Sequence, residues 1–271
     1  MDIKKLMVRS VSGLVYCLVI VGCILAGETG VLVLGGLLSA LACIEFARIS
    51  HDLTTKTIPA LVLDIAACVC LCMGYTGYML FLWLALMIAR FVLELYLDAP
   101  HPLRDLAHSM MSQIYIGLPM GIMVVVAHTL SPMLILALFI LIWVNDTGAF
   151  LVGCTLGRHK LFERISPKKT WEGFLGGVAF CVGTAVLFGL YCSDFFGMGA
   201  VGGGLGAWIG LGAVTAVFGT WGDLVESMIK RNLNIKDSGN IIPGHGGILD
   251  RIDSLLLVLP AAALYFALIL R

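Results

Sequence analysis

The stretch LLLVLPAAALYFALIL, residues 255–270, contains no charged residue and directly follows IIPGHGGILDRIDS, residues 241–254. An apolar run of this length approaches the roughly 20 residues that a transmembrane helix needs. The preceding segment supplies glycines, one histidine and the sequence Asp-Arg-Ile-Asp, and charges of this kind are costly to place in lipid. The junction therefore predicts a polar site at a membrane surface, held at the start of a spanning helix.

The composition of the whole chain supports a membrane location. Of its 271 residues, 60% are hydrophobic and 13% are charged, and the mean hydropathy is +1.01. Soluble domains are far more polar. The 32 glycines fit the same class, because small residues let transmembrane helices approach closely. The formal net charge is zero, so nothing in the charge balance indicates a nucleic-acid partner, and none is expected.

We predict an all-α, polytopic integral membrane protein with about nine transmembrane helices. The chain is expected to form a single membrane domain over residues 1–271, with amino-terminal helices in 1–130 and the site's helices and cytoplasmic loops in 131–271. The predicted spans are 10–26, 30–48, 58–75, 78–96, 106–128, 131–152, 174–192, 203–227 and 253–270.

The positions of Lys and Arg predict the orientation of these spans. If the amino terminus is cytoplasmic, all 17 Lys and Arg residues except Arg90 and Arg271 fall on the cytoplasmic side. The two longest polar connections, and the site with them, should then face the cytoplasm. The nine cysteines lie mostly inside apolar spans and lack the spacing of metal or redox motifs. They are expected to be small buried side chains.

Acidic residues inside the spans mark candidate functional positions, because a charge in lipid is expensive. Glu45 lies three residues before Arg48 near a helix end, so a local ion pair or contact with water explains it. Asp64 is open between a structural hydrogen bond and a functional role. The remaining acidic residues adjoin the two polar cytoplasmic connections and are Asp146, Asp223 and Glu226.

One face of the helix expected around 203–231 is polar at its cytoplasmic end. The spacing i, i+3, i+4 and i+7 places on that face Asp223, Glu226, Ser227 and Lys230. Asp250 and Asp253 likewise share a face at the start of the last helix. These two carboxylates could complement the helix dipole, or with Asp223 they could hold a hard cation such as Mg²⁺.

The glycine-rich segment before the last helix suggests anion binding. Gly246 and Gly247 would let the backbone approach a ligand beside a helix amino terminus. His245 could be a ligand, a phosphate donor or a turn residue. The other connection, GRHKLFERISPKKTWEG at 157–173, contains five Lys or Arg, of which Lys168 and Lys169 could bind phosphate or simply follow the positive-inside rule. Ser166 and Pro167 predict a turn or a helix start.

Carboxylates for a cation and basic residues for phosphates, both at the cytoplasmic surface, indicate phosphoryl-type chemistry between a soluble and a lipid substrate. Residues 227–253 read Ser-Met-Ile-Lys-Arg, four residues, Lys-Asp-Ser-Gly, two residues, then IPGHGGILDRID. This pattern resembles the signature of phosphatidate cytidylyltransferases, also called CDP-diacylglycerol synthases. NDTGAFLVG at 145–153 and ISPKKTWEGFLGG at 165–177 resemble a second region of that family, with Phe150 where members often have Tyr.

The resemblance implies that CTP and phosphatidate react to CDP-diacylglycerol and pyrophosphate, with Mg²⁺ and a second, monovalent cation such as K⁺. It also implies a homodimer. The short loops and the lack of a soluble extension favour a bacterial inner (plasma) membrane. The catalytic residues implied are Asp223, Lys230, Asp250 and Asp253. The metal ligands implied are Asp223, Asp250, Asp253 and Asp146. The substrate-binding residues implied are Ser227, Arg231, Lys236, His245, Gly246, Gly247, Arg251, Lys168 and Lys169.

Other classes of function compete with this interpretation. An ion-coupled secondary transporter would use intramembrane acids as a relay, but these acids cluster at the cytoplasmic end and no inverted repeat is visible. Another lipid-phosphate transferase or a polyprenol kinase would also use aspartate motifs. The paired DxxDG and DxxxD spacing of CDP-alcohol phosphotransferases is not found in this sequence.

Overall fold

The computed structural model describes residues 3–50, 57–98, 100–199, 202, 204–239, 241, 244 and 246–269. The structure is 82% helical, which confirms the all-α class. The helices are α1 (Ile3–Leu25), α2 (Glu28–Ser50), α3 (Ile58–Cys72), α4 (Tyr78–Glu94), α5 (Pro102–Ser112), α6 (Leu118–Thr129), α7 (Pro132–Leu156), α8 (Trp171–Tyr191), α9 (Ser193–Phe196), α10 (Leu205–Asn232) and α11 (Leu249–Ile269). A 3₁₀ turn, η1 (Gly74–Thr76), a π-helical turn, η2 (Gln113–Gly117), and two strands, β1 (Lys160–Phe162) and β2 (Ser166–Thr170), complete the described elements.

Helices occupy each predicted span, but six are both long and apolar enough to cross a membrane in the described part of the chain. These are α2, α7, α8, α10, α11 and the continuous helix made by α5, η2 and α6. The apolar part of α1, Ser10–Leu25, and the whole of α3 are shorter. At 1.5 Å per residue, the 17-residue α4 measures about 25 Å, less than the ~30 Å hydrocarbon core. The structure thus supports a polytopic membrane protein without establishing nine spans.

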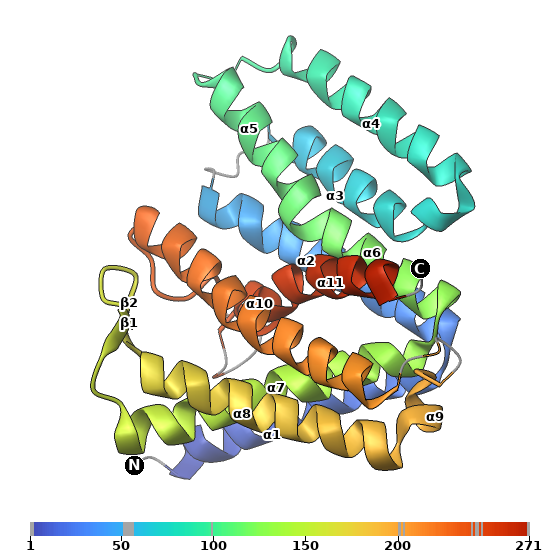
Figure 1. Ribbon diagram of the computed structural model, residues 1–271. Coiled ribbons are helices and arrows are strands. Elements are labelled where there is room, and N and C mark those ends of the chain that lie inside the picture. The colour runs from blue at the N-terminus through green and yellow to red at the C-terminus, as the bar shows by residue number, and fades with distance from the viewer. Residues whose placement is uncertain are drawn as a thin grey trace. The chain divides into compact units, whose positions relative to one another are not determined.

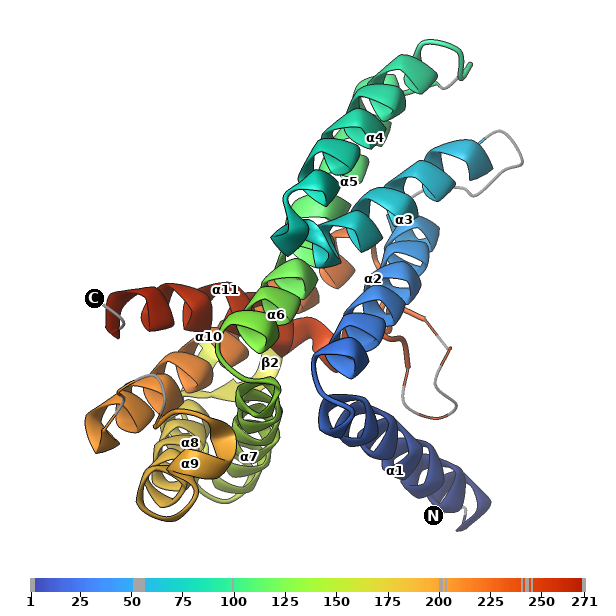
Figure 2. The same ribbon diagram turned by 90° about the vertical axis from the view of Figure 1, so that its right-hand side faces the viewer.

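The chain divides into two compact units, which are described separately. The first unit comprises residues 1–125 together with 235–251. In it α2 packs against α1 and α3, and α3 packs against α4 (Figure 2). Gly77, with φ 73°, lies in the turn that leads into α4. The glycine-rich segment before α11 belongs to this unit, although it follows α10 in the sequence.

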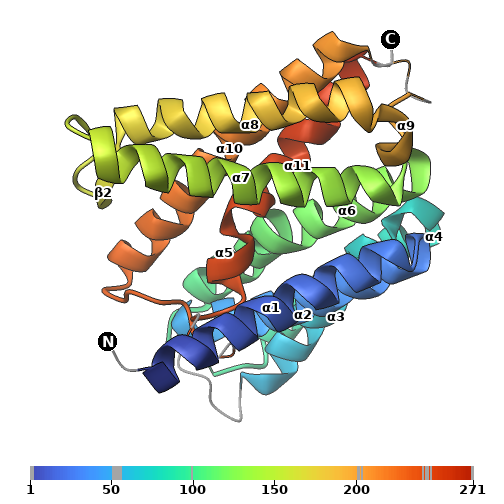
Figure 3. The same ribbon diagram turned by 90° about the horizontal axis from the view of Figure 1, so that it is seen from below.

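The second unit comprises residues 126–234 together with 252–271. Here α7 and α8 lie side by side along most of their lengths, and α10 packs against α8 and α7 (Figures 1 and 3). Small residues allow this approach, because a Cβ at Gly176 of α8 would lie 2.5 Å from the Val152 side chain of α7. A Cβ at Gly212 of α10 would lie 2.8 Å from that of Ala185 in α8. Close packing of this kind holds transmembrane helices together, because the hydrophobic effect does not drive helices together within lipid.

Local capping defines where two helices of this second unit begin. Ser131 accepts a hydrogen bond from the Met133 N–H at 3.1 Å, with Pro132 at the start of α7. Thr170 accepts one from the Gly173 N–H at 3.1 Å and so caps α8 at Trp171, three residues before the predicted start of that span. The cap also ends β2, so the hairpin and α8 are joined without an intervening loop.

Candidate active site

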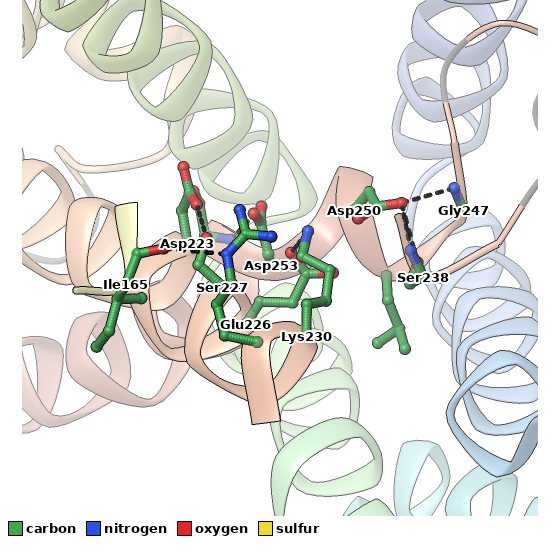
Figure 4. Close-up of polar contacts among 12 residues, drawn as sticks. Ile165, Asp223, Glu226, Ser227, Lys230, Ser238, Gly247, Asp250 and Asp253 are labelled. Carbon is green, nitrogen blue, oxygen red and sulfur yellow. Dashed lines mark hydrogen bonds and ion pairs between the residues drawn. The ribbon is translucent and has the colours of Figure 1, made fainter. Parts of the chain in front are cut away.

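The polar face predicted on α10 is present in the structure. The Ser227 hydroxyl donates to Asp223 Oδ1 at 3.1 Å, and Lys230 Nζ lies 2.6 Å from Glu226 Oε2 (Figure 4). Glu226 is buried, with 3% of its surface exposed, whereas the Asp223 side chain is 38% exposed. The i, i+4 pairs therefore leave Asp223 as the accessible carboxylate of this face.

The β1–β2 hairpin brings a basic residue to Asp223, just as Lys230 lies beside Glu226. Lys169 Nζ lies 2.8 Å from Asp223 Oδ2 and donates to the Thr220 carbonyl oxygen at 3.3 Å. Its neighbour Lys168 is exposed. Because successive side chains of a strand point to opposite faces, only one of the two lysines reaches α10 in this way. The structure thus distinguishes two residues that the sequence treated alike.

Contacts at both ends of the hairpin hold it in place. The Glu172 carboxylate accepts hydrogen bonds from the N–H groups of Arg158 and His159 at 3.0 and 3.1 Å, and His159 Nδ1 lies 2.5 Å away. Arg231 Nε, at the end of α10, donates to the Ile165 carbonyl oxygen at 3.3 Å (Figure 4). The prediction of a turn or helix start at Ser166 was wrong, because that residue begins β2, which pairs antiparallel with β1.

Asp253, near the start of α11, is close enough to carboxylates of α7 and α10 to interact with them electrostatically. Its carboxylate interacts electrostatically with those of Asp223, Glu226 and Asp146, and its Oδ1 accepts the Ser254 N–H at 2.6 Å. Asp146 is exposed on α7. Two of these carboxylates, Asp223 and Glu226, lie beside the ammonium groups of Lys169 and Lys230. Among the described residues, no three acidic, histidine or cysteine side chains are close enough to form a complete metal cage.

Asn145 is a polar residue of this unit that the sequence analysis missed. It is 1% exposed, and its Nδ2 lies 3.5 Å from Asp146 Oδ1. Its Oδ1 is buried and has no hydrogen-bond partner within the described ranges. A Cβ at Gly177 of α8 would lie 2.8 Å from that oxygen. The stretch NDTGAFLVG could have pointed to Asn145, because it begins with this residue, but only Asp146 was predicted from it as a site residue.

In the first unit, Asp250 organises the segment that precedes α11. Its Oδ2 accepts hydrogen bonds from the Ser238 N–H and hydroxyl, both at 3.0 Å, and from the Gly247 N–H at 2.8 Å (Figure 4). Gly246 has φ 84° and lies against the same oxygen, since a Cβ there would be 2.7 Å from it. The Gly247 N–H, predicted to face an anion, thus has its acceptor in Asp250, in the first turn of α11.

The basic residues that flank this segment are on the surface. Lys236 and Arg251 are both exposed, and the Arg251 carbonyl oxygen accepts a hydrogen bond from the Tyr16 hydroxyl at 3.1 Å. His245 lies outside the described residues. The candidates of the first unit that the structure describes are therefore one aspartate held by hydrogen bonds, two glycines and two exposed basic side chains.

The two remaining acidic candidates of the first unit have structural partners. Glu45 is 1% exposed, and its Oε2 accepts the Ser238 hydroxyl at 3.0 Å and the Leu249 N–H at 2.8 Å. The prediction of a local pair with Arg48 or of contact with water was therefore wrong. Asp64 accepts a short hydrogen bond from Ser109 and lies 3.6 Å from Arg90 Nε, so the structural hydrogen bond considered for it is present.

Comparisons with known proteins place these residues in a family context. A family model described as the cytidylyltransferase family matches residues 7–269. A phosphatidate cytidylyltransferase of Staphylococcus aureus (strain COL) is 47% identical over 160 residues, which is 58% of this chain and 57% of that protein. One of Bacillus subtilis (strain 168) is 47% identical over 134 residues, 48% of this chain and 45% of that protein. The chain thus spans little more than half the length of the curated relatives it matches.

Proposed function

The chain belongs to the cytidylyltransferase family, and from that premise we propose that it is a membrane-bound phosphatidate cytidylyltransferase. Its relatives carry that name. The observation that carries the proposal is the group of carboxylates and lysines around Asp223, at the end of a helix apolar enough to span a membrane. Charged residues in such a helix are expected to serve a function because they are costly.

The proposed reaction needs positioning more than it needs a strong base. An anionic oxygen of phosphatidate attacks the α-phosphorus of CTP, a new P–O bond forms, and the bond from the α-phosphorus to the bridging oxygen breaks. The electron pair leaves with pyrophosphate, and CDP-diacylglycerol remains. Because the nucleophile is already ionised, the residues of the chain contribute by aligning two anions and neutralising their charge.

Lysines of the second unit are the proposed phosphate partners. Lys169 and Lys230 already lie beside carboxylates, so each can be shared between its acidic partner and a phosphate oxygen. Arg231 holds the hairpin that carries Lys169, and Ser227 orients the Asp223 carboxylate. Lys168, Lys236 and Arg251 are exposed and remain proposed as contributors to phosphate attraction.

The donor set of the second unit suits Mg²⁺. Mg²⁺ is usually held by one or two carboxylates, with water and substrate phosphates completing its shell, so a complete protein cage is not required. Asp253 interacts electrostatically with three other carboxylates, and acidic groups gathered in this way suit a cation. We propose Asp223 and Asp253 as its ligands, with Asp146 as a further candidate of this unit, and a monovalent ion such as K⁺ in addition. Asp250, which belongs to the first unit, remains a separate proposal as a metal ligand. The cation would supply charge neutralisation for the triphosphate.

The apolar helices imply a lipid bilayer, where phosphatidate is found. We propose a multi-pass protein of a bacterial inner membrane, with its amino terminus and active site on the cytoplasmic side, as the Lys and Arg positions predict. A homodimer is part of the same proposal. A transporter is disfavoured by family membership.

A direct assay tests the proposal. The purified protein in detergent, given labelled CTP, phosphatidate and Mg²⁺, should produce labelled lipid that depends on each of the three. Asp223→Asn, which removes the charge and keeps the shape, should reduce the rate by about 100-fold or more. Asp98→Asn, at an exposed position after α4, is the matched control. A wild-type protein that makes no labelled lipid, or an Asp223→Asn variant at full rate, would overturn the proposal.

A further inference from the structure

The buried carboxylate of Glu45 has no part in the proposed chemistry, yet it lies in a helix apolar enough to span a membrane. Charges at such positions are costly and are retained chiefly where they serve a function. Both hydrogen bonds to its Oε2 come from the distant end of the chain, from Ser238 and from Leu249. The side chain thus ties α2 to the segment that precedes α11.

The two partners of Glu45 lie at the two ends of this segment. Ser238 begins the glycine-rich stretch and Leu249 is the first residue of α11. A single carboxylate oxygen that accepts from both fixes the two ends of the segment on α2. Hydrogen bonds to a charged acceptor are among the strongest in proteins. We name the described residues of this segment, 238, 239, 241, 244 and 246–249, the glycine loop.

Asp250 holds the same loop at Ser238 and Gly247. The Ser238 hydroxyl lies 3.0 Å from an oxygen of each carboxylate, but it carries one hydrogen and can donate to one of them at a time. The N–H groups of Ser238 and Gly247 still supply Asp250, and the Leu249 N–H still supplies Glu45. The two carboxylates therefore hold the loop through a shared serine and three backbone donors.

Two glycines of the loop are explained by Glu45. A Cβ at Gly239 would overlap the Glu45 carboxylate, and a Cβ at Gly247 would overlap both that carboxylate and the Ser238 hydroxyl. Neither position has a positive φ among the described backbone angles, so conformational freedom is not the reason for glycine there. These glycines make room for a buried carboxylate, whereas the sequence had suggested room for a phosphate.

We propose that Glu45 is a positioning residue that fixes both ends of the glycine loop on α2 and thereby sets the affinity of the protein for the triphosphate of its nucleotide. Glu45 does not touch the substrate. It acts through the loop, whose flanking residues Lys236 and Arg251 expose positive charge. A loop tied at both ends loses less entropy when it binds a ligand, and so binds more tightly. The role in affinity rests on the proposed function, whereas the role as an anchor does not.

Hydrogen exchange of the full-length protein in detergent tests the anchor without any substrate. In Glu45→Gln, which keeps one acceptor oxygen, the amides of Ser238, Gly247 and Leu249 should exchange about tenfold faster than in the wild type. Glu45→Ala should exchange faster still. Glu94→Gln is the matched control, because Glu94 is another buried carboxylate of the same unit and is paired with Arg90 at 2.6 Å. It should leave these amides unchanged.

A double-variant design adds an independent test. Gly239→Ala should speed exchange of the loop because its Cβ displaces the carboxylate, and this effect should largely disappear when Glu45 is already Ala. Additive effects of the two substitutions would contradict direct contact. Exchange that is unchanged in Glu45→Gln, or raised equally by Glu94→Gln, would overturn the anchor.

Kinetics then test the link to the nucleotide. Glu45→Gln should raise KM for CTP by about tenfold, with a smaller change in kcat and in KM for phosphatidate. Faster loop exchange with an unchanged KM for CTP would overturn the link while the anchor stands. If wild-type protein makes no CTP-dependent lipid, the proposed function fails, and the exchange result still decides the anchor.

Discussion

Replacing Lys169 by Met should separate catalysis from stability, because its ammonium group lies on Asp223 at the surface of the candidate site. The two side chains are 24% and 38% exposed and their charged atoms lie 2.8 Å apart. Partly exposed pairs of this kind stabilise a fold by about 0.2–1 kcal/mol. The melting temperature of Lys169→Met should therefore fall by less than about 4 °C.

The loss of activity in the same variant should be much larger. A hydrogen bond from a charged donor to a phosphate oxygen contributes about 1.5–3 kcal/mol. Since each ~1.4 kcal/mol is tenfold in rate, kcat/KM for CTP should fall by about 10- to 150-fold. Lys169→Arg keeps the charge and should recover part of the rate. Initial rates of lipid labelling at several CTP concentrations measure this directly.

The matched control is Lys160→Met, which removes an exposed lysine from β1 of the same hairpin. It should change neither the rate nor the melting temperature appreciably. The reasoning would be refuted if Lys169→Met kept more than half of the wild-type kcat/KM. It would also be refuted if the variant lost several kcal/mol of stability, because the main role of Lys169 would then be to hold the hairpin against α10.

Three further predictions concern packing, the hairpin and the thiols. Gly222→Ala should destabilise the protein by ~1–3 kcal/mol, seen as a lower melting temperature, because the new Cβ would lie 2.6 Å from the Asp253 carbonyl oxygen. Gly206→Ala in the same helix has no atom within 4 Å and should be neutral or slightly stabilising. Glu172→Gln should lower activity about three- to tenfold with little change in melting temperature, because it weakens contacts that orient the hairpin. All nine cysteines are free, so gel mobility and activity should not respond to reductant.

Local periodicity made the α10 face predictable. Positions three and four apart on a helix are neighbours, and the structure confirms this in the hydrogen bond from Ser227 to Asp223 and in the pair of Lys230 with Glu226. The positions of the helices followed from hydropathy for the same reason. The number of membrane spans could not be predicted from hydropathy, because α3 and α4 are shorter than the apolar segments assigned to them.

Contacts between residues that are distant in the sequence could not be predicted from the sequence. Glu45 was assigned to Arg48 because a single chain displays only its near neighbours, whereas its true partners, Ser238 and Leu249, lie 193 and 204 residues away. The hairpin was missed for a different reason. Its strands are short and polar, so no alternation of apolar residues marks them, and only pairing with each other reveals them.

The measurement that tests the central claim most directly compares CTP labelled at the α-phosphate with CTP labelled at the γ-phosphate. With purified protein, phosphatidate and Mg²⁺, cytidylyl transfer predicts that the α-label enters the lipid and the γ-label leaves in pyrophosphate. Lipid that carries the γ-label would show phosphorylation of the lipid instead. That result, or a lipid that carries neither label, would contradict the account.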